Sequence, residues 1–215
     1  MLTSGGNSGI VRSASFTKNR CASRKNRYYT RFFERGETMI RSFRGITPSI
    51  GANSYIDESA VVIGDVEIGE NCSVWPLTVI RGDINQIRIG DDTNIQDGSV
   101  LHVTHQGEFS PEGAQLHIGS QVTVGHKVLL HGCRIGNQCL IGMGSIVTDN
   151  AIIEDRVMIG SGSLVPPNKR LESGYLYLGN PVVQKRPLSE REIEFLSYVA
   201  DHYILLKQSY SALST

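Results

Sequence analysis

The sequence predicts an all-β solenoid that is followed by a single α-helix. Three observations predict it: aliphatic residues recur every six positions, glycine is unusually frequent, and apolar residues take up helical spacing only near residue 189. Glycine makes up 23 of the 215 residues, whereas its usual share is roughly 7 %. Such a chain is expected to contain many tight turns and few large core side chains.

The six-residue period is the strongest of these signals. An α-helix has 3.6 residues per turn, so residues six apart would be scattered around its axis. A single strand is also excluded, because the repeat extends over far more residues than one strand of a small domain. Short strands joined by turns satisfy the period, because three hexads close one triangular coil and stacked coils pair as parallel strands. Eighteen aliphatic positions fall in four phased blocks: Ile50, Ile56, Val62, Ile68, Val74, Ile80; Ile89, Ile95, Leu101; Ile118, Val124, Leu130; Ile135, Ile141, Val147, Ile153, Ile159, Val165.

The pattern changes after Pro187. Ser189 and Glu192 have the spacing of a capping box, and apolar residues then follow at helical intervals from Ile193 to Leu206. We expect residues 189–209 to form one amphipathic helix that packs along the coils. The predicted organisation is therefore a β-helix domain at 39–187 and a helical segment at 188–215.

The charge balance excludes some partners and sets one segment apart. The chain has 21 basic and 21 acidic residues, which gives no reason to expect nucleic acid or an anionic membrane as a partner. No apolar run approaches the ~20 residues of a membrane span. Residues 1–38 hold eight Lys or Arg and only two Glu. We expect a disordered basic leader there, with Met39 as the natural start; organelle targeting and a functional basic arm are the alternatives.

The four cysteines include no CxxC pair, so they suggest neither a disulfide framework nor a cysteine zinc site. Free thiols are typical of a reducing compartment, and we therefore expect a cytoplasmic protein.

Stacking the hexads brings several histidines into register. His102 and His131 follow equivalent anchors of successive coils, so they are expected in one column, about 4.8 Å apart per coil. His126 stacks on Asp97 but lies about 16 Å of extended chain from His131. It is therefore expected to meet the histidine pair of a neighbouring copy across a trimer interface. Three neutral imidazoles with an open fourth position form a catalytic zinc arrangement; the alternative is that these are ordinary surface histidines.

The repeat resembles that of hexapeptide-repeat proteins over residues 48–170, and this resemblance implies a left-handed parallel β-helix. Three stretches are more specific: Arg81-Gly82-Asp83, Asn94 to His102, and Gly125 to Gly132. They are similar to those of the γ-class carbonic anhydrase family across residues 48–186. The resemblance implies reversible hydration of CO₂ to bicarbonate by metal-bound hydroxide at the interfaces of a homotrimer. It implies one zinc, iron or other divalent ion per subunit interface, held by His102, His126 and His131.

The same resemblance implies roles for four further residues. Arg81 and Asp83 match residues that hold the subunit interface and help to place bicarbonate. Gln96 matches a residue that hydrogen-bonds metal-bound solvent, and Asp97 one that pairs near the arginine. His105 is a candidate proton shuttle. Two more residues are candidates to line the site: Tyr177 and Asn180.

The sequence also departs from the family. Active members carry a glutamate directly after the residue that matches Asp83, and a long acidic loop with a shuttle glutamate. Here the first position is Ile84, and the 105–116 loop is short. Two other functions therefore stay open: a weakly active or non-catalytic metal-binding trimer, and a hexapeptide-repeat acyltransferase that uses CoA. The sequence leaves the native metal, the turnover and the physiological substrate undetermined.

Overall fold

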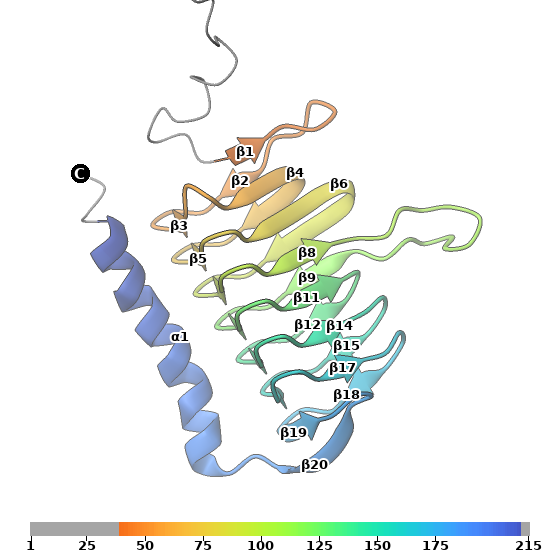
Figure 1. The fold of residues 1–215 in the computed structure, drawn as a ribbon, viewed down its shortest axis with the longest axis vertical. Helices are drawn as coiled ribbons and strands as arrows, with labels where there is room; N and C mark the ends of the chain where they lie inside the picture. The colour runs from red at the N-terminus through yellow and green to blue at the C-terminus, as the bar shows by residue number, and fades with distance from the viewer. Residues whose placement is uncertain (1–38, 212–215) are drawn as a thin grey trace, which may run out of the picture. The chain divides into compact units, whose positions relative to one another are not determined.

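The structure, a computed structural model, describes residues 39–211, which form a stack of β-coils followed by one helix (Figure 1). The predicted solenoid and its C-terminal helix are confirmed. The expected leader, residues 1–38, lies outside the described residues. Nearly all neighbouring strands pair in parallel, as stacked coils require; the exception among the paired strands is β19 with β20, which is antiparallel.

Two sheets hold the named strands of this part of the chain. The 12-stranded sheet contains β1 (Met39–Arg41), β2 (Ser49–Ile50), β4 (Val61–Ile68), β6 (Val79–Ile89), β8 (Val100–His102), β9 (Leu116–Ile118), β11 (Leu129–His131), β12 (Arg134–Ile135), β14 (Ile146–Val147), β15 (Ile152–Ile153), β17 (Leu164–Val165) and β18 (Arg170–Leu171). The 8-stranded sheet contains β3 (Tyr55–Ile56), β5 (Ser73–Val74), β7 (Asn94–Ile95), β10 (Thr123–Val124), β13 (Leu140–Ile141), β16 (Met158–Ile159), β19 (Tyr175–Leu178) and β20 (Val183–Pro187).

The aliphatic anchors of the repeat form the core. All eighteen are buried except Ile50 and Ile56 of the first coil, which are partly buried and pack against the others. Because side chains alternate along a strand, each anchor points inward while its neighbour faces outward. Because each coil covers the anchors of the next one, the anchors form one continuous buried column through the stack.

The corners of the coils depend on a tight backbone turn. At one corner the turn residue has a positive φ in successive coils, as at Asn71 (φ 54°), Asp92 (φ 56°) and Gln121 (φ 56°). Gly90 stands beside this corner, where a Cβ would come within 2.7 Å of the carbonyl carbon of Gly119 in the next coil. The close approach of successive coils therefore requires glycine here, which accounts for part of the glycine excess.

Side-chain caps tie this corner of one coil to the next. The Oδ1 atom of Asp91 accepts a hydrogen bond from the Glu70 amide at 2.8 Å, and Oδ1 of Asn137 accepts one from the Ser120 amide at 2.9 Å. The Oδ1 atom of Asp155 accepts from the Asn137 amide at 2.7 Å. These bonds satisfy amides that no strand pairing would reach.

Two features go beyond the regular hexad pattern. Strands β4 and β6 run for eight and eleven residues and cross a corner without a turn. A hairpin also leaves the solenoid after β8, with backbone bridges between Thr104 and Ala114 and between Gly107 and Ser110. The hairpin protrudes from the side of the stack (Figure 1).

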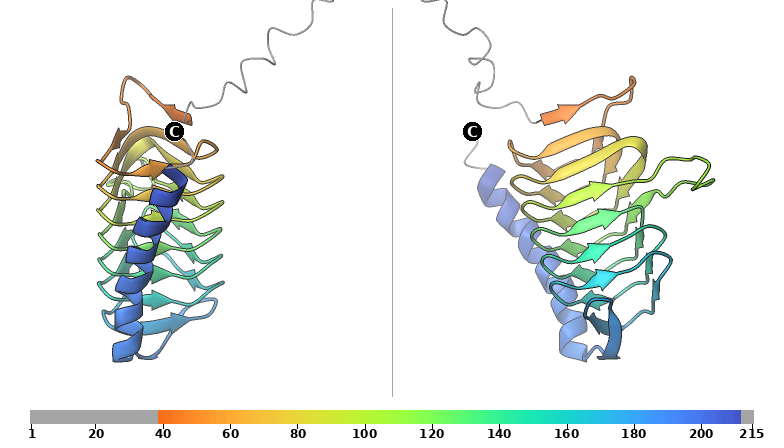
Figure 2. Two further views of the ribbon diagram at one scale, coloured as in Figure 1. Left: turned by 90° about the vertical axis from the view of Figure 1, so that its left-hand side faces the viewer. Right: turned by 45° about the vertical axis from the view of Figure 1, so that its right-hand side comes forward.

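The helix α1 (Glu190–Ser211) begins where the capping box predicts and runs back along the coils (Figure 2). The Ser189 hydroxyl accepts a hydrogen bond from the Glu192 amide at 3.3 Å, and the Glu192 carboxylate accepts from the Ser189 amide at 2.9 Å. On the 8-stranded sheet the helix packs through aromatic contacts, including Tyr203 and Tyr210 against Trp75 at ring centroid distances of 5.6 and 5.0 Å. Across residues 39–211, no helix has the length and apolar character needed to cross a membrane.

Two adjacent isoleucines test this account of the core. Ile153 is 1 % exposed, whereas Ile152 precedes it on β15 and is half-buried on the opposite face. We expect Ile153→Ala to lower the free energy of unfolding by about 2–5 kcal/mol, and Ile152→Ala to lower it by clearly less. Urea denaturation measures both values, and equal losses from the two variants would contradict the inward register.

Candidate metal centre

The strongest candidate site is a pair of histidines on adjacent strands. Strands β8 and β11 pair in parallel, and their register sets His131 directly beside His102. The Nδ1 atom of His102 lies 3.1 Å from Nε2 of His131. Two nitrogens bound to one tetrahedral zinc at ~2.0–2.1 Å would be about 3.3 Å apart. The facing nitrogens therefore fit a shared divalent ion.

Each of the three predicted ligands has one ring nitrogen bonded to an aspartate. His102 Nε2 lies 3.1 Å from Oδ1 of Asp83, His126 Nδ1 lies 2.9 Å from Oδ2 of Asp97, and His131 Nδ1 lies 2.5 Å from Oδ1 of Asp149. A neutral histidine that donates to a carboxylate has its tautomer fixed, and its other nitrogen keeps a lone pair for a metal. The donor chemistry of this set fits a metal bound by three imidazoles.

Burial, together with nearby positive charge, favours the neutral form of His102. Burial lowers the pKa of His102, and the nearby Arg81 and His131 lower it further, against the opposing effect of its bond to Asp83. Burial alone would raise the pKa of Asp83, but its bonds to Arg81 and His102 hold that pKa below the ordinary value. The result is an ionised carboxylate that orients a neutral imidazole, which is the form that binds metal.

Arg81 reaches the same carboxylate from the other side. Its guanidinium donates to Oδ2 of Asp83 at 2.6 Å, and its side chain remains 43 % exposed. The arginine can therefore hold Asp83 and still present N–H groups to an anion that arrives from outside.

His126 lies on another part of the same coil, at the corner between β10 and β11, with 45 % of its side chain exposed. Among residues 39–211, no group of three or more His, Cys, Asp or Glu side chains is placed to hold a metal ion within one chain. A single copy thus presents two incomplete parts: the His102–His131 pair and the separate His126.

Gln96 lies at the His126 corner and is 5 % exposed. Its side-chain amide donates to Oδ1 of Asn94 at 3.1 Å, and its backbone carbonyl oxygen accepts from the Thr78 hydroxyl at 3.1 Å. These contacts hold Gln96 next to Asp97. Its expected contact with metal-bound solvent remains a prediction.

The remaining candidates lie apart from the histidine pair. His105 is exposed at the start of the hairpin, three residues after His102. Tyr177 is 3 % exposed and points into the last coil, three strands from β10 in the 8-stranded sheet, with its hydroxyl bonded to Gln184 at 3.1 Å. Asn180 is exposed after β19. Within the described part of one chain, no hydrogen bond joins Tyr177 or Asn180 to the ligand histidines, because the solenoid continues for further coils before reaching them.

Asp149 is a site residue that the sequence reasoning missed. Besides holding His131, it accepts a hydrogen bond from the Thr104 hydroxyl at 2.7 Å through Oδ2. The hexad period gives no signal for it, because β11 and β14 pair with an offset of 17 residues, as in Leu130 beside Val147. Asp149 therefore lies one position beyond the residue that is in register with His131.

Comparison with known proteins places the chain in a family. A family model described as bacterial transferase hexapeptide (six repeats) matches residues 47–82 and 132–167. Protein YrdA of Escherichia coli is 59 % identical over 172 residues, which cover 80 % of this chain and 94 % of YrdA. A carbonic anhydrase of Geobacillus kaustophilus is 43 % identical, and the match covers 81 % of this chain and 92 % of that protein. The mitochondrial gamma carbonic anhydrase 1 of Arabidopsis thaliana is 36 % identical, and the match covers 89 % of this chain and 69 % of that protein.

The chain belongs to the γ-class carbonic anhydrase family. The left-handed parallel β-helix that the resemblance implied is the fold of this family member. A crystal structure of a putative acetyltransferase from Bacillus cereus is also similar, with a TM-score of 0.76, 38 % identity, and 81 % of this chain and 98 % of that one covered. The fold alone therefore does not decide between the activities that these names carry.

The contact between Asp149 and His131 yields a prediction for metal binding. Asp149→Asn keeps the side-chain shape but removes the charge that orients the imidazole. We expect zinc affinity to fall about 10–100-fold, as measured by competition with a chromogenic chelator. Asp201→Asn, at an exposed position on α1, is the matched control and should leave the affinity unchanged. Equal affinities for the two variants would exclude a positioning role for Asp149.

Proposed function

We propose that this protein is a divalent-metal-dependent carbonic anhydrase whose sites form between the copies of a homotrimer. The observation that carries the proposal is that the three histidines are divided between two places on the chain. Two histidines face each other at 3.1 Å, and the third lies elsewhere on the chain with its own aspartate. Completing a three-histidine set requires His126 from another copy.

The outer surface beside the histidine pair supports such an interface. Val100, Leu129 and Ile146 occupy one column of adjacent strands and are 40 %, 38 % and 39 % exposed. Val100 and His102 are two residues apart on β8, so their side chains leave the same face of the sheet. An aliphatic column beside polar groups on a surface is typical of a protein contact. A second copy that brings its His126 to the pair would cover this column.

The contact is head-to-tail, because one copy gives the pair and the next gives the single histidine. Head-to-tail contacts close into rings when the rotation between copies allows it. A three-faced solenoid that uses two neighbouring corners favours a ring of three, with one site at each of three interfaces.

The chain's own residues would have different roles in such a site. A bound zinc, iron or other divalent ion would lower the pKa of a water on its open position to ~7 and so supply a nucleophile at neutral pH. Asp83, Asp97 and Asp149 hold the imidazoles with one nitrogen outward. Gln96 would orient the attacking solvent through its amide. Arg81 would attract the bicarbonate anion through the exposed part of its guanidinium.

Proton export is the step for which this chain is least equipped. A glutamate is expected after Asp83 in active relatives, and Ile84 stands there with 42 % of its surface exposed. His105 is an exposed titratable group three residues after His102. It would pass the proton to solvent. This makes a slow enzyme, or a metal-binding trimer with little activity, the second candidate.

An acyltransferase is the third candidate, since the similar Bacillus cereus structure is described as that of a putative acetyltransferase. Three histidines with three aspartate partners favour a metal over a single general base.

We further propose a cytoplasmic location, because the cysteines among the described residues, Cys72, Cys133 and Cys139, are free and buried, as is usual in a reducing compartment.

The hydration activity can be tested directly. We expect stopped-flow assays of the zinc- or iron-loaded protein to show CO₂ hydration, and His126→Ala to lose at least about 100-fold of it together with its metal. His117→Ala changes a half-buried histidine on another strand and should leave both unchanged. Metal binding without hydration would favour the non-catalytic trimer, and saturable binding of acetyl-CoA would favour the acyltransferase.

A further inference from the structure

The helix α1 carries a second apolar face that the solenoid does not cover. Its inner face packs on the 8-stranded sheet through Leu196, Ala200 and Tyr203, of which the first two are nearly fully buried. On the other side, Phe195, Tyr198 and Leu205 are 46 %, 65 % and 64 % exposed. Together with exposed His202 they follow a spacing of three, four and three residues along the helix. We name these four residues the outer stripe.

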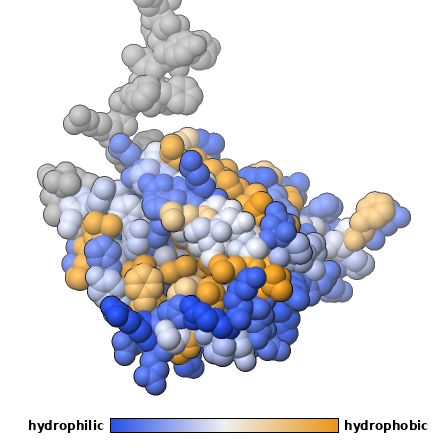
Figure 3. Space-filling view, turned by 60° about the horizontal axis from the view of Figure 1, so that its bottom comes forward, coloured by the Kyte–Doolittle hydropathy of each residue, from blue (hydrophilic) through white to orange (hydrophobic). Residues whose placement is uncertain are grey.

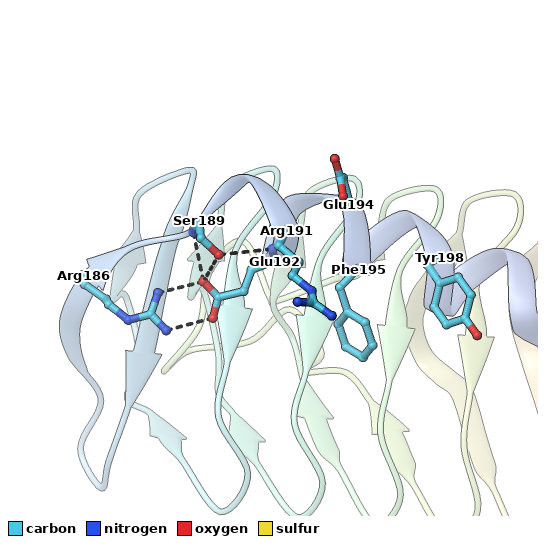
Figure 4. A pocket seen from close by; sticks show the side chains of 7 residues that line it. All are labelled: Arg186, Ser189, Arg191, Glu192, Glu194, Phe195 and Tyr198. Atoms are coloured by element: carbon cyan, nitrogen blue, oxygen red, sulfur yellow. Dashed lines mark hydrogen bonds and ion pairs between the residues drawn. The ribbon is translucent and has the colours of Figure 1, made fainter.

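The outer stripe is built for aromatic contact. Phe195 and Tyr198 stack with ring centroids 6.3 Å apart, and Tyr198 stacks on His202 at 6.3 Å. A groove of about 760 Å³ lies at its first turn, and Figure 4 shows Phe195, Tyr198 and Arg191 projecting to the same side of the helix. A row of exposed rings beside a groove resembles the aromatic anchors of protein interfaces more than a solvated helix surface.

The hairpin at 104–114 is the second unexplained surface feature. Its tip residue Phe109 is 98 % exposed, and an apolar tip stands out beyond the body of the protein (Figure 3). Its base is fixed, because the Thr104 hydroxyl donates to Asp149 at 2.7 Å and the Asn85 amide donates to the Thr104 carbonyl at 2.9 Å. An exposed phenylalanine on an anchored hairpin is suited to contact another protein.

We propose that the hairpin of one copy docks on the outer stripe of the next, with Phe109 against Tyr198. This inference rests on the proposed function, because the shared site brings the His102–His131 corner of one copy to the His126 corner of the next. The hairpin starts two residues after His102. On the other copy α1 flanks the His126 corner, since it contacts β10 and its Tyr203 lies close enough for the charge of Asp97 to act on it.

The reach of the hairpin agrees with this placement. Five extended residues, from Thr104 to Phe109, span about 16 Å at ~3.3 Å per residue. A helix with its side chains is about 10–12 Å across, so the hairpin is long enough to cross α1. The groove beside the outer stripe is lined by two arginines and two glutamates, Arg186, Arg191, Glu192 and Glu194, so its charges balance. The contact is therefore expected to depend on the aromatic side chains.

Subunit exchange measures the contact in the full-length protein. Trimers labelled with donor or acceptor fluorophores are mixed, and the exchange rate is followed by energy transfer. We expect Phe109→Ser and Tyr198→Ser each to speed exchange by about tenfold. The double variant should be no faster than either single one, because both changes remove the same contact. Val183→Ser, at a position 55 % exposed on β20, is the matched control and should exchange like the unchanged protein.

The outcomes separate this inference from the proposed function when metal content and CO₂ hydration are measured on the same samples. Exchange of the Phe109 and Tyr198 variants at the control rate, in a protein with metal and hydration activity, overturns the docking alone. Additive effects in the double variant also overturn the pairing. Faster, non-additive exchange in a protein that binds no metal supports the docking and overturns the function. Both substituted side chains are exposed in the single chain, so circular dichroism should show unchanged folding.

Discussion

The parallel pairing of β8 with β11 is the constraint on which the site depends. Hydrogen bonds between successive coils fix the register, and register decides which side chains stand side by side. A slip of one residue would turn His102 and His131 into the core and bring Leu101 and Leu130 out. The buried column of anchors makes that slip costly, because every coil would expose aliphatic surface at once. The core thus holds two imidazole nitrogens 3.1 Å apart on the outside.

The sequence was enough to predict most of this architecture. The hexad period marks the anchors, and counting from them pairs His102 with His131 and Asp97 with His126, as the structure does. The capping box marked the start of the helix within one residue. These predictions succeeded because each depends on a local period or a short motif that the fold repeats in every coil.

Other features depend on contacts that no period records. Asp149 reaches His131 from the following coil, and Thr104 reaches Asp149 from the base of the hairpin. Strand β6 crosses a corner without a turn, which carries Asp83 to His102. A side chain that approaches from an irregular segment leaves no repeating signal in the sequence. Tyr177 and Asn180 illustrate the opposite case. Their motif near the end of the chain predicts that they line the site, but within one chain they lie several coils away from the histidines.

The three histidine–aspartate pairs carry the account of function, and their division between copies is its central claim. It can be tested by mixing two inactive proteins, His126→Ala and His131→Ala, under conditions in which subunits exchange. Each mixed ring contains interfaces where the intact pair of one variant meets the intact His126 of the other. Random mixing would restore about one quarter of the sites in a symmetric ring. The account predicts recovery of CO₂ hydration and metal binding to about that fraction, whereas verified subunit exchange without recovery would contradict it.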